Sequence, residues 1–212
     1  MKLLQRVVGP IATNLYVLAD EATSEAIAID TAAPCVDWLT TTLAERGWTL
    51  KVIVSTHRHW DHIGDNAPVA AQTGAQIAAH TLDRHGLEHP TATLAPFPIL
   101  PSVPAVELAE GGRIKFGGID LDVLHTPGHT EGSVCLLADH ERLLITGDTL
   151  FAGGWGRTDL PGGSADQMVE SLARLSTLAD DLRVLPGHGP GSVLEREKRW
   201  LADVAALRRL PF

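Results

Sequence analysis

The sequence predicts an α/β fold in which strands and helices alternate through two similar halves. Short apolar runs of strand length recur along the 212 residues, separated by segments with helical periodicity. Several of these runs end in loops that carry histidine or aspartate beside glycine. The hydrophobic fraction of 44% and the charged fraction of 20% are ordinary for a globular chain with a sizeable core. We therefore expect strand ends that bring polar side chains together.

The first half is predicted to form an open sheet with helices on at least one face. The expected strands are residues 2–8, 13–19, 25–30, 51–55 and 76–79. Val36, Leu39 and Leu43 recur at helical spacing, and Gly47 is a suitable stop just past that helix. A second helix is expected from about residue 65 to the residue before Gly74.

The segment 85–105 is proline-rich and is predicted to be irregular. An irregular segment of this length in a compact domain is usually functional or a linker. We interpret it either as a surface crossover whose apolar residues pack on the body, or as a lid over a site. In both cases it joins the two halves.

The second half repeats this style, although no repeat of the sequence itself is visible. Its expected strands are residues 113–116, 121–125, 134–137, 143–146 and 184–185. Two capping-box patterns, Ser164 to Gln167 and Ser192 to Glu195, each predict the start of a helix.

Charge and composition disfavour several classes of function. A net charge of −9 disfavours binding to nucleic acid, because an acidic surface repels phosphate groups. We find no apolar run long enough to span a membrane and no signal peptide at the N-terminus. Cys35 and Cys135 make no disulfide framework; we interpret Cys135 as a buried core thiol and Cys35 as a structural residue near a helix start. We expect a cytoplasmic protein with a small-molecule substrate; the oligomeric state is not indicated.

The stretch from Ser55 to Gly64 carries three histidines and one aspartate directly after an apolar run. His57 and His59 are two residues apart, so they project to the same side of an extended loop. Asp61 and His62 are adjacent and must diverge toward a second point. The simplest use of this layout is one metal at each point. Nitrogen and carboxylate ligands suit zinc, and also iron or manganese.

Three later stretches each place one further metal-competent side chain at a strand end beside glycine. They contribute His129 after Gly128, Asp148 after Gly147, and His188 after Gly187. Glycine permits the tight turns that steer a short side chain. Together with the earlier stretch, four strand ends would converge at one edge of a sheet sandwich.

The pattern His57-x-His59-x-Asp61-His62, followed by His129, Asp148 and His188, resembles the metallo-β-lactamase superfamily. The resemblance covers nearly the whole chain. It implies a single domain over residues 1–212 with a four-layer αβ/βα sandwich and metals at one edge between the sheets. It also implies that His57, His59 and His129 hold a first metal. Asp61, His62 and His188 would hold a second, and Asp148 would bridge the two.

Within that superfamily, residues 153–164 and 186–190 resemble the compact branch of hydroxyacylglutathione hydrolases, the glyoxalase II-like enzymes. The common zinc β-lactamases have cysteine where Asp148 stands, and the flavin-linked diiron branch has glutamate where His59 stands. The nucleic-acid-cutting branch carries a large inserted domain that 212 residues cannot hold. Only 24 residues follow His188, where longer glyoxalase II enzymes have a helical domain that grips glutathione. The resemblance therefore predicts the type of reaction better than it predicts which thiol the substrate contains.

The function implied is a hydrolase that depends on two divalent metals, most simply Zn²⁺, and cleaves hydroxyacylglutathione-type thioesters with a metal-bound hydroxide. Asp61 would orient the hydroxide. Arg157 is a candidate for binding a substrate carboxylate and Trp155 for a pocket wall. The alternatives, which we favour for these two residues, are an ion pair with a nearby aspartate and packing on the core.

Other functions remain open on this ligand set. A persulfide dioxygenase would use a single iron held by His57, His129 and Asp148, and would oxidise its substrate. A lactonase or other esterase would use the same dimetal core with residues 85–105 as a lid. A non-catalytic binding module is the fourth possibility. The remaining histidines, apart from His125 as a core residue, are expected on the surface or in loops.

Overall fold

The computed structural model describes residues 1–91 and 95–211, which form two six-stranded sheets and one two-stranded hairpin. The first sheet has the order β1-β2-β3-β4-β5-β6, with β1 (Lys2–Val8), β2 (Thr13–Asp20), β3 (Glu25–Ile29), β4 (Thr49–Val54), β5 (Gln76–His80) and β6 (Val106–Leu108). The second has the order β14-β13-β10-β9-β8-β7, with β7 (Arg113–Phe116), β8 (Ile119–His125), β9 (Val134–Ala138), β10 (Leu143–Gly147), β13 (Arg183–Pro186) and β14 (Ser192–Val193). The hairpin pairs β11 (Leu150–Phe151) with β12 (Gly154–Trp155).

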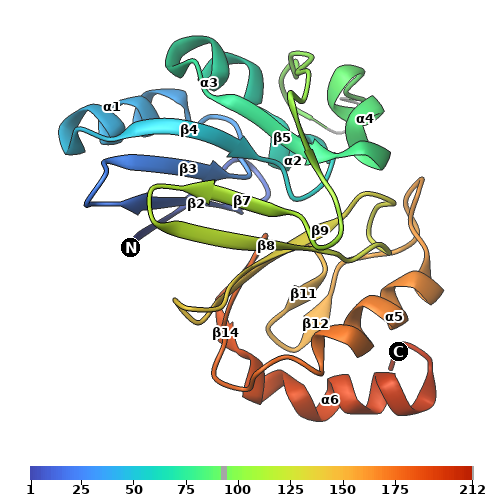
Figure 1. Cartoon of the computed structure of the whole chain (residues 1–212). Coiled ribbons are helices and arrows are strands. Elements are labelled where there is room, and N and C mark those ends of the chain that lie inside the picture. Colours follow the sequence, from blue (N-terminus) through green and yellow to red (C-terminus); the bar gives the residue numbers. More distant parts are fainter. Residues whose placement is uncertain (92–94, 212) are drawn as a thin grey trace.

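The four longest helices lie on the outer faces of the two sheets (Figure 1). The helices are α1 (Val36–Arg46), α2 (Trp60–Ile63), α3 (Asn66–Thr73), α4 (Arg84–Glu88), α5 (Ala165–Leu175) and α6 (Leu194–Leu207), and a 3₁₀ turn, η1, covers Thr81–Asp83. Figure 1 shows α1 and α3 over the first sheet, and α5 and α6 beneath the second.

Alternation along the strands explains the layering, because successive side chains of a strand point to opposite faces. On β2, Leu15 and Val17 join the core under α1 and α3, whereas Tyr16 and Leu18 enter the core between the sheets. On β10, Leu144 joins the core under α5 and α6, whereas Leu143 and Ile145 enter the core between the sheets. Three apolar cores therefore separate four layers, which confirms the predicted αβ/βα sandwich.

Most predicted strands and helices agree with the structure to within about two residues, but the second capping box is wrong. Ser164 does cap α5, since its Oγ accepts a hydrogen bond from the backbone N of Gln167. By contrast, the residue before α6 is Val193, and no side chain caps that helix. Ser192 instead belongs to β14, where it pairs with Val184, because the chain adds an edge strand before turning into the helix.

The segment predicted to be irregular contains more regular structure than expected. It begins inside α4, and β6 follows directly after it. Leu87 and Ile99 are buried in the core under α1 and α3, as a crossover that packs on the body requires. Residues 92–94, which are part of the same prediction, lie outside the described residues. The chain passes from the first sheet to the second between Leu108 and Arg113.

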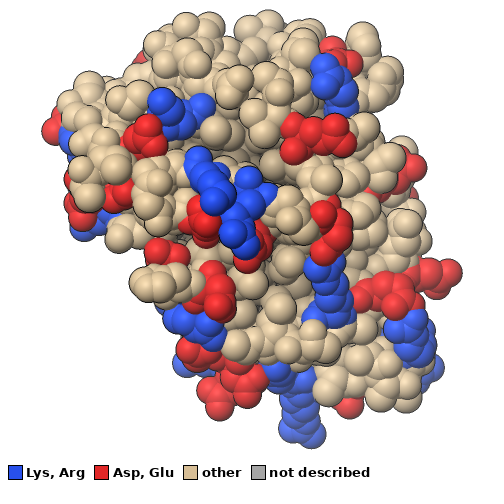
Figure 2. Space-filling model, viewed as in Figure 1, with Lys and Arg blue, Asp and Glu red and all other residues tan. Residues whose placement is uncertain are grey.

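Acidic and basic side chains are mixed on the face shown in Figure 2, where blue and red groups adjoin one another. Several are paired, for example Arg113 with Asp122 and Arg174 with Glu110. Across the described residues, no helix has the length and apolar character needed to cross a lipid bilayer.

Candidate metal centre

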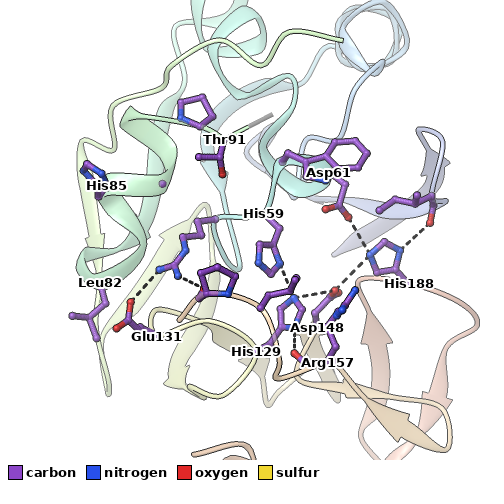
Figure 3. Close-up of a pocket in the computed structure, with 18 of the residues that line it drawn as sticks. His59, Asp61, Leu82, His85, Thr91, His129, Glu131, Asp148, Arg157 and His188 are labelled. Atoms are coloured by element: carbon purple, nitrogen blue, oxygen red, sulfur yellow. Dashed lines mark hydrogen bonds and ion pairs between the residues drawn. The ribbon is translucent and has the colours of Figure 1, made fainter. Parts of the chain in front are cut away.

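The seven predicted ligand residues come from four separate strand ends and meet at one place between the two sheets. His57 and His59 lie in the loop after β4, and α2 then carries Asp61 and His62. His129 follows β8, Asp148 follows β10 and His188 follows β13. Figure 3 shows the side chains of His59, His129, Asp148, Asp61 and His188 turned toward one another. The sequence thus predicted which side chains the fold brings together.

The first group consists of His57, His59 and His129, which each offer one ring nitrogen, and these three nitrogens all lie within 4.8 Å of one another. Its tightest contact is 2.8 Å, between Nδ1 of His59 and Nε2 of His129. Such a set of three nitrogen atoms matches the protein ligands of a zinc site that keeps an open position.

The second group consists of Asp61, His62 and His188. Nε2 of His62 lies 3.2 Å from Nε2 of His188, and Oδ2 of Asp61 lies 3.1 Å from each of these nitrogens. Asp148 stands between the groups. Its carboxylate oxygens are 3.5 Å from Nε2 of His62, of His129 and of His188.

Partners on the outer side of the rings fix the tautomers of four histidines. Nδ1 of His129 lies 2.7 Å from the carbonyl oxygen of Arg157, and Nδ1 of His188 lies 3.2 Å from that of Ile11. Because a carbonyl oxygen only accepts, both Nδ1 atoms must donate, which leaves the Nε2 lone pairs facing inward. This arrangement is typical of histidines that bind metal.

Asp30 orients the ring of His62 directly and the ring of His57 through Thr56. It accepts hydrogen bonds from the backbone N and Oγ1 of Thr56, each at 2.8 Å, and lies 2.9 Å from Nδ1 of His62. Oγ1 of Thr56 then lies 3.1 Å from Nδ1 of His57. Sequence reasoning missed Asp30. The available signal was its position directly after a buried strand, like the ligands themselves.

Two buried atoms in the centre have no hydrogen-bond partner, namely Nε2 of His57 and Oδ1 of Asp148. A buried polar atom without a partner costs free energy, and native structures rarely contain one. Both atoms point into the cluster of inward-facing lone pairs. A bound cation would satisfy them all, so the residues present fit a divalent metal.

The pKa values agree with lone pairs that are free to bind a cation. Burial and neighbouring imidazoles hold the pKa of His57 well below its ordinary value, and burial and His129 lower the pKa of His59 to about 3. Although burial alone would raise the pKa of Asp61, the nearby His62 and His188 lower it. His62 and His188 are the exceptions: nearby carboxylates, among them Asp61 and Asp148, outweigh burial and raise the pKa of each imidazole.

A glycine makes room for the carboxylate of Asp148. A Cβ atom at Gly187 would lie 2.2 Å from Oδ1 of Asp148 and 2.7 Å from Cε1 of His62. Its backbone is held on both sides, since Gly187 N donates to the carbonyl of Gly147 and its carbonyl accepts from Asn14 N, each at 2.7 Å. No side chain fits here while Asp148 keeps its place.

The centre opens into a cavity of about 940 Å³. Its wall includes Trp60, Leu82, Phe151 and Leu160, with the exposed His85 on α4. In Figure 3, His85 and Leu82 lie on the side of the cavity away from Asp61 and His188. A site that combines an apolar wall with convergent polar groups is typical of small-molecule binding.

Arg157 and Trp155, the two candidate substrate contacts, make the ion pair and the core packing that were predicted as their alternative roles. Arg157 lines the cavity, but its Nε and NH2 atoms donate to the two carboxylate oxygens of Asp159 at 2.7 Å each. Trp155 packs on the core under α5 and α6, and its ring lies 5.8 Å from that of Trp200. His125 is half-buried and stacks on His80 at 4.2 Å.

Comparison with known families identifies the chain. The model of the metallo-beta-lactamase superfamily matches residues 8–188, a span that contains all seven residues of the centre. The chain belongs to the metallo-beta-lactamase superfamily. The members of this superfamily to which it is similar include hydrolases, and the chain is a metallo-hydrolase by that relationship.

Among the superfamily's curated proteins, an uncharacterised protein of Aquifex aeolicus is 36% identical, over 91% of this chain and 92% of its own length. The hydroxyacylglutathione hydrolase of Maricaulis maris is 34% identical over 82% of this chain. That alignment spans only 60% of the length of the enzyme.

Solved superfamily structures are similar along nearly the whole chain. The B3 metallo-beta-lactamase BLEG-1 superimposes with a TM-score of 0.87 and 33% identity, covering 93% of this chain and 97% of its own. ETHE1 from Myxococcus xanthus superimposes with a TM-score of 0.81 and 31% identity, covering 97% of this chain and 85% of its own. The protein TTHA1623, solved in a di-iron-bound form, superimposes with a TM-score of 0.81 and 33% identity, covering 92% of this chain and 97% of its own.

Proposed function

We propose that the centre holds two divalent metal ions, the first with His57, His59 and His129 and the second with Asp61, His62 and His188. Asp148 would be the ligand shared by the two groups, since its carboxylate lies 3.5 Å from histidines of both. The observation that carries the proposal is the pair of orphaned buried atoms, Nε2 of His57 and Oδ1 of Asp148. Zinc is the metal we expect from the ligand set, and iron is the alternative that the di-iron relative raises.

We further propose that the chain hydrolyses thioesters of the hydroxyacylglutathione type. Two bound divalent metals would supply Lewis acidity and lower the pKa of a water molecule toward neutrality. Oδ2 of Asp61 accepts a hydrogen bond from Thr13 Oγ1 and lies beside Nε2 of His62 and of His188, at 3.1 Å each, so it is the oxygen directed at the second group. Its Oδ1 is therefore the atom that would accept a hydrogen bond from the attacking water and orient it.

The geometry around the centre supports a thioester as the substrate. A thiolate leaves without a strong general acid, and the protic side chains of the seven-residue centre are all directed at the cluster. The similarity to the Maricaulis maris hydroxyacylglutathione hydrolase supports the same reaction class. The cavity of about 940 Å³ beside the centre is large enough for a small thioester.

The direct test is hydrolysis of S-lactoylglutathione by the purified, metal-loaded protein. Asp148→Ala should lower kcat/KM by orders of magnitude, because it removes the carboxylate between the groups. Asp122→Asn is the matched control, since Asp122 pairs with Arg113 on the exposed surface of the second sheet. If the metal-loaded wild-type protein leaves the thioester intact, the substrate assignment is wrong.

The second candidate is a persulfide dioxygenase, and the observation that favours it is the 31% identity to ETHE1 over 97% of the chain. This function would need one iron at His57, His129 and Asp148. Oxygen uptake by the iron-loaded protein with glutathione persulfide separates the two candidates. Oxygen uptake without thioester hydrolysis would replace the hydrolase by the dioxygenase.

A further inference from the structure

Asp83 is a buried carboxylate that is not one of the seven residues of the metal centre. It ends η1, its side chain is 1% exposed, and it accepts four hydrogen bonds. Two come from Arg58, through the backbone N at 2.9 Å and NH1 at 3.0 Å. The others come from Oγ1 of Thr130 at 2.6 Å and from the backbone N of Gly132 at 3.0 Å. Burying a charge is costly unless it is fully hydrogen-bonded, and this one is.

The partners of Asp83 sit next to the three histidines of the first group. Arg58 lies between His57 and His59 in the chain, and Thr130 directly follows His129. One carboxylate therefore holds together two loops that are far apart in sequence and that carry all three histidines. Two of its four bonds go to backbone N–H groups, so Asp83 restrains the paths of the loops themselves.

The surroundings leave little freedom for this arrangement to shift. A Cβ atom at Gly132 would lie 2.7 Å from both Cγ and the backbone N of Asp83, so the close approach needs glycine there. On the other side, NH2 of Arg58 donates to the carbonyl of Pro161 at 2.8 Å and NH1 lies 3.3 Å from Glu131. Arg58 is thus held at both ends of its guanidinium.

The second group has different supports. His62 rests on Asp30, Asp61 on Thr13 and His188 on the carbonyl of Ile11. None of the hydrogen bonds of Asp83 reaches these residues. A change at Asp83 should therefore act on one group and spare the other.

We propose that Asp83 is a positioning residue that sets the distance between His59 and His129, and thereby the affinity of the first group for its metal. The inference rests on the proposed metal centre. Outer partners that orient metal ligands typically contribute roughly 10- to 100-fold to metal affinity. Asp83→Asn keeps the shape of the side chain but replaces one acceptor oxygen by an NH₂ group, which opposes donors of Arg58 or Thr130.

The test is competition for zinc between the protein and a chelator, which yields two binding constants per chain. His129→Ala and His188→Ala assign these constants to the first and second groups. Asp83→Asn should weaken the first constant roughly 10- to 100-fold and leave the second nearly unchanged. Glu88→Gln is the matched control, because it removes an exposed ion pair with Arg84 on the adjacent helix. It should change neither constant.

Thr130→Val provides an independent arm if Asp83→Asn unfolds. It removes the 2.6 Å bond to Asp83 with little change of volume, and the same selective weakening is expected. Unchanged constants, or an equal loss at both groups, would overturn the inference and leave Asp83 a purely structural residue. Failure of the metal centre itself is distinguishable, because the wild-type protein would then bind fewer than two zinc ions.

Discussion

Gly187→Ala tests how closely the position of the Asp148 carboxylate is fixed. The new Cβ atom would lie 2.2 Å from Oδ1 of Asp148, whereas real Cβ atoms essentially never approach another atom closer than 3.0 Å. Gly187 cannot retreat readily, because both of its backbone polar groups are hydrogen-bonded at 2.7 Å. Asp148 must therefore move by roughly 1 Å, a displacement that can cost about 100-fold in rate when it affects a catalytic geometry.

The assay is kcat/KM for S-lactoylglutathione at saturating zinc, with metal content and thermal unfolding measured on the same samples. Gly187→Ala should lose about 100-fold in kcat/KM while it remains folded. Gly154→Ala is the control, since a Cβ atom there meets no atom within 4 Å. If Gly187→Ala keeps wild-type activity and metal content, the position of Asp148 does not matter in the way proposed.

Three further predictions concern groups around the centre and in the core. Asp30→Asn should weaken zinc binding roughly 10- to 100-fold in chelator competition, because Nδ1 of His62 loses its charged acceptor. Cys135 should resist alkylation, followed by mass spectrometry, until the protein unfolds, because burial raises the pKa of its thiol to about 11. Tyr16→Phe should lower the free energy of unfolding by about 1 kcal/mol in urea titrations, because the 2.8 Å bond from its hydroxyl to Pro186 is lost. Burial raises the pKa of Tyr16, so its neutral form stabilises the fold below about pH 10. This contribution to stability is lost as the pH rises further. Above about pH 10, Tyr16→Phe should therefore lose less stability with rising pH than the wild-type protein.

The strands and the larger helices could be predicted because their apolar residues repeat with a clear period. The short elements could not. β14 has two residues, and its Ser192 resembles a helix cap, so only the pairing with Val184 reveals an edge strand. Similarly, α4 begins just before the proline-rich segment and is stabilised by the burial of Leu87 rather than by its local sequence.

The inner residues of the candidate site were predictable and their supports were not. Histidine and aspartate at strand ends carry a recognisable spacing, so His57 and Asp148 could be named from the chain alone. Asp83 carries no such signal. Its partner Thr130 lies 47 positions further along the chain, and only the fold brings the two together.

The most direct test of the account is the number of metal ions bound per chain, measured together with thioester hydrolysis as metal is added back to the chelated protein. We predict two zinc ions per chain and activity that rises with their binding. His188→Ala should retain one ion and lose most of the activity. Binding of a single ion with full thioester hydrolysis, or hydrolysis without any metal, would contradict the account.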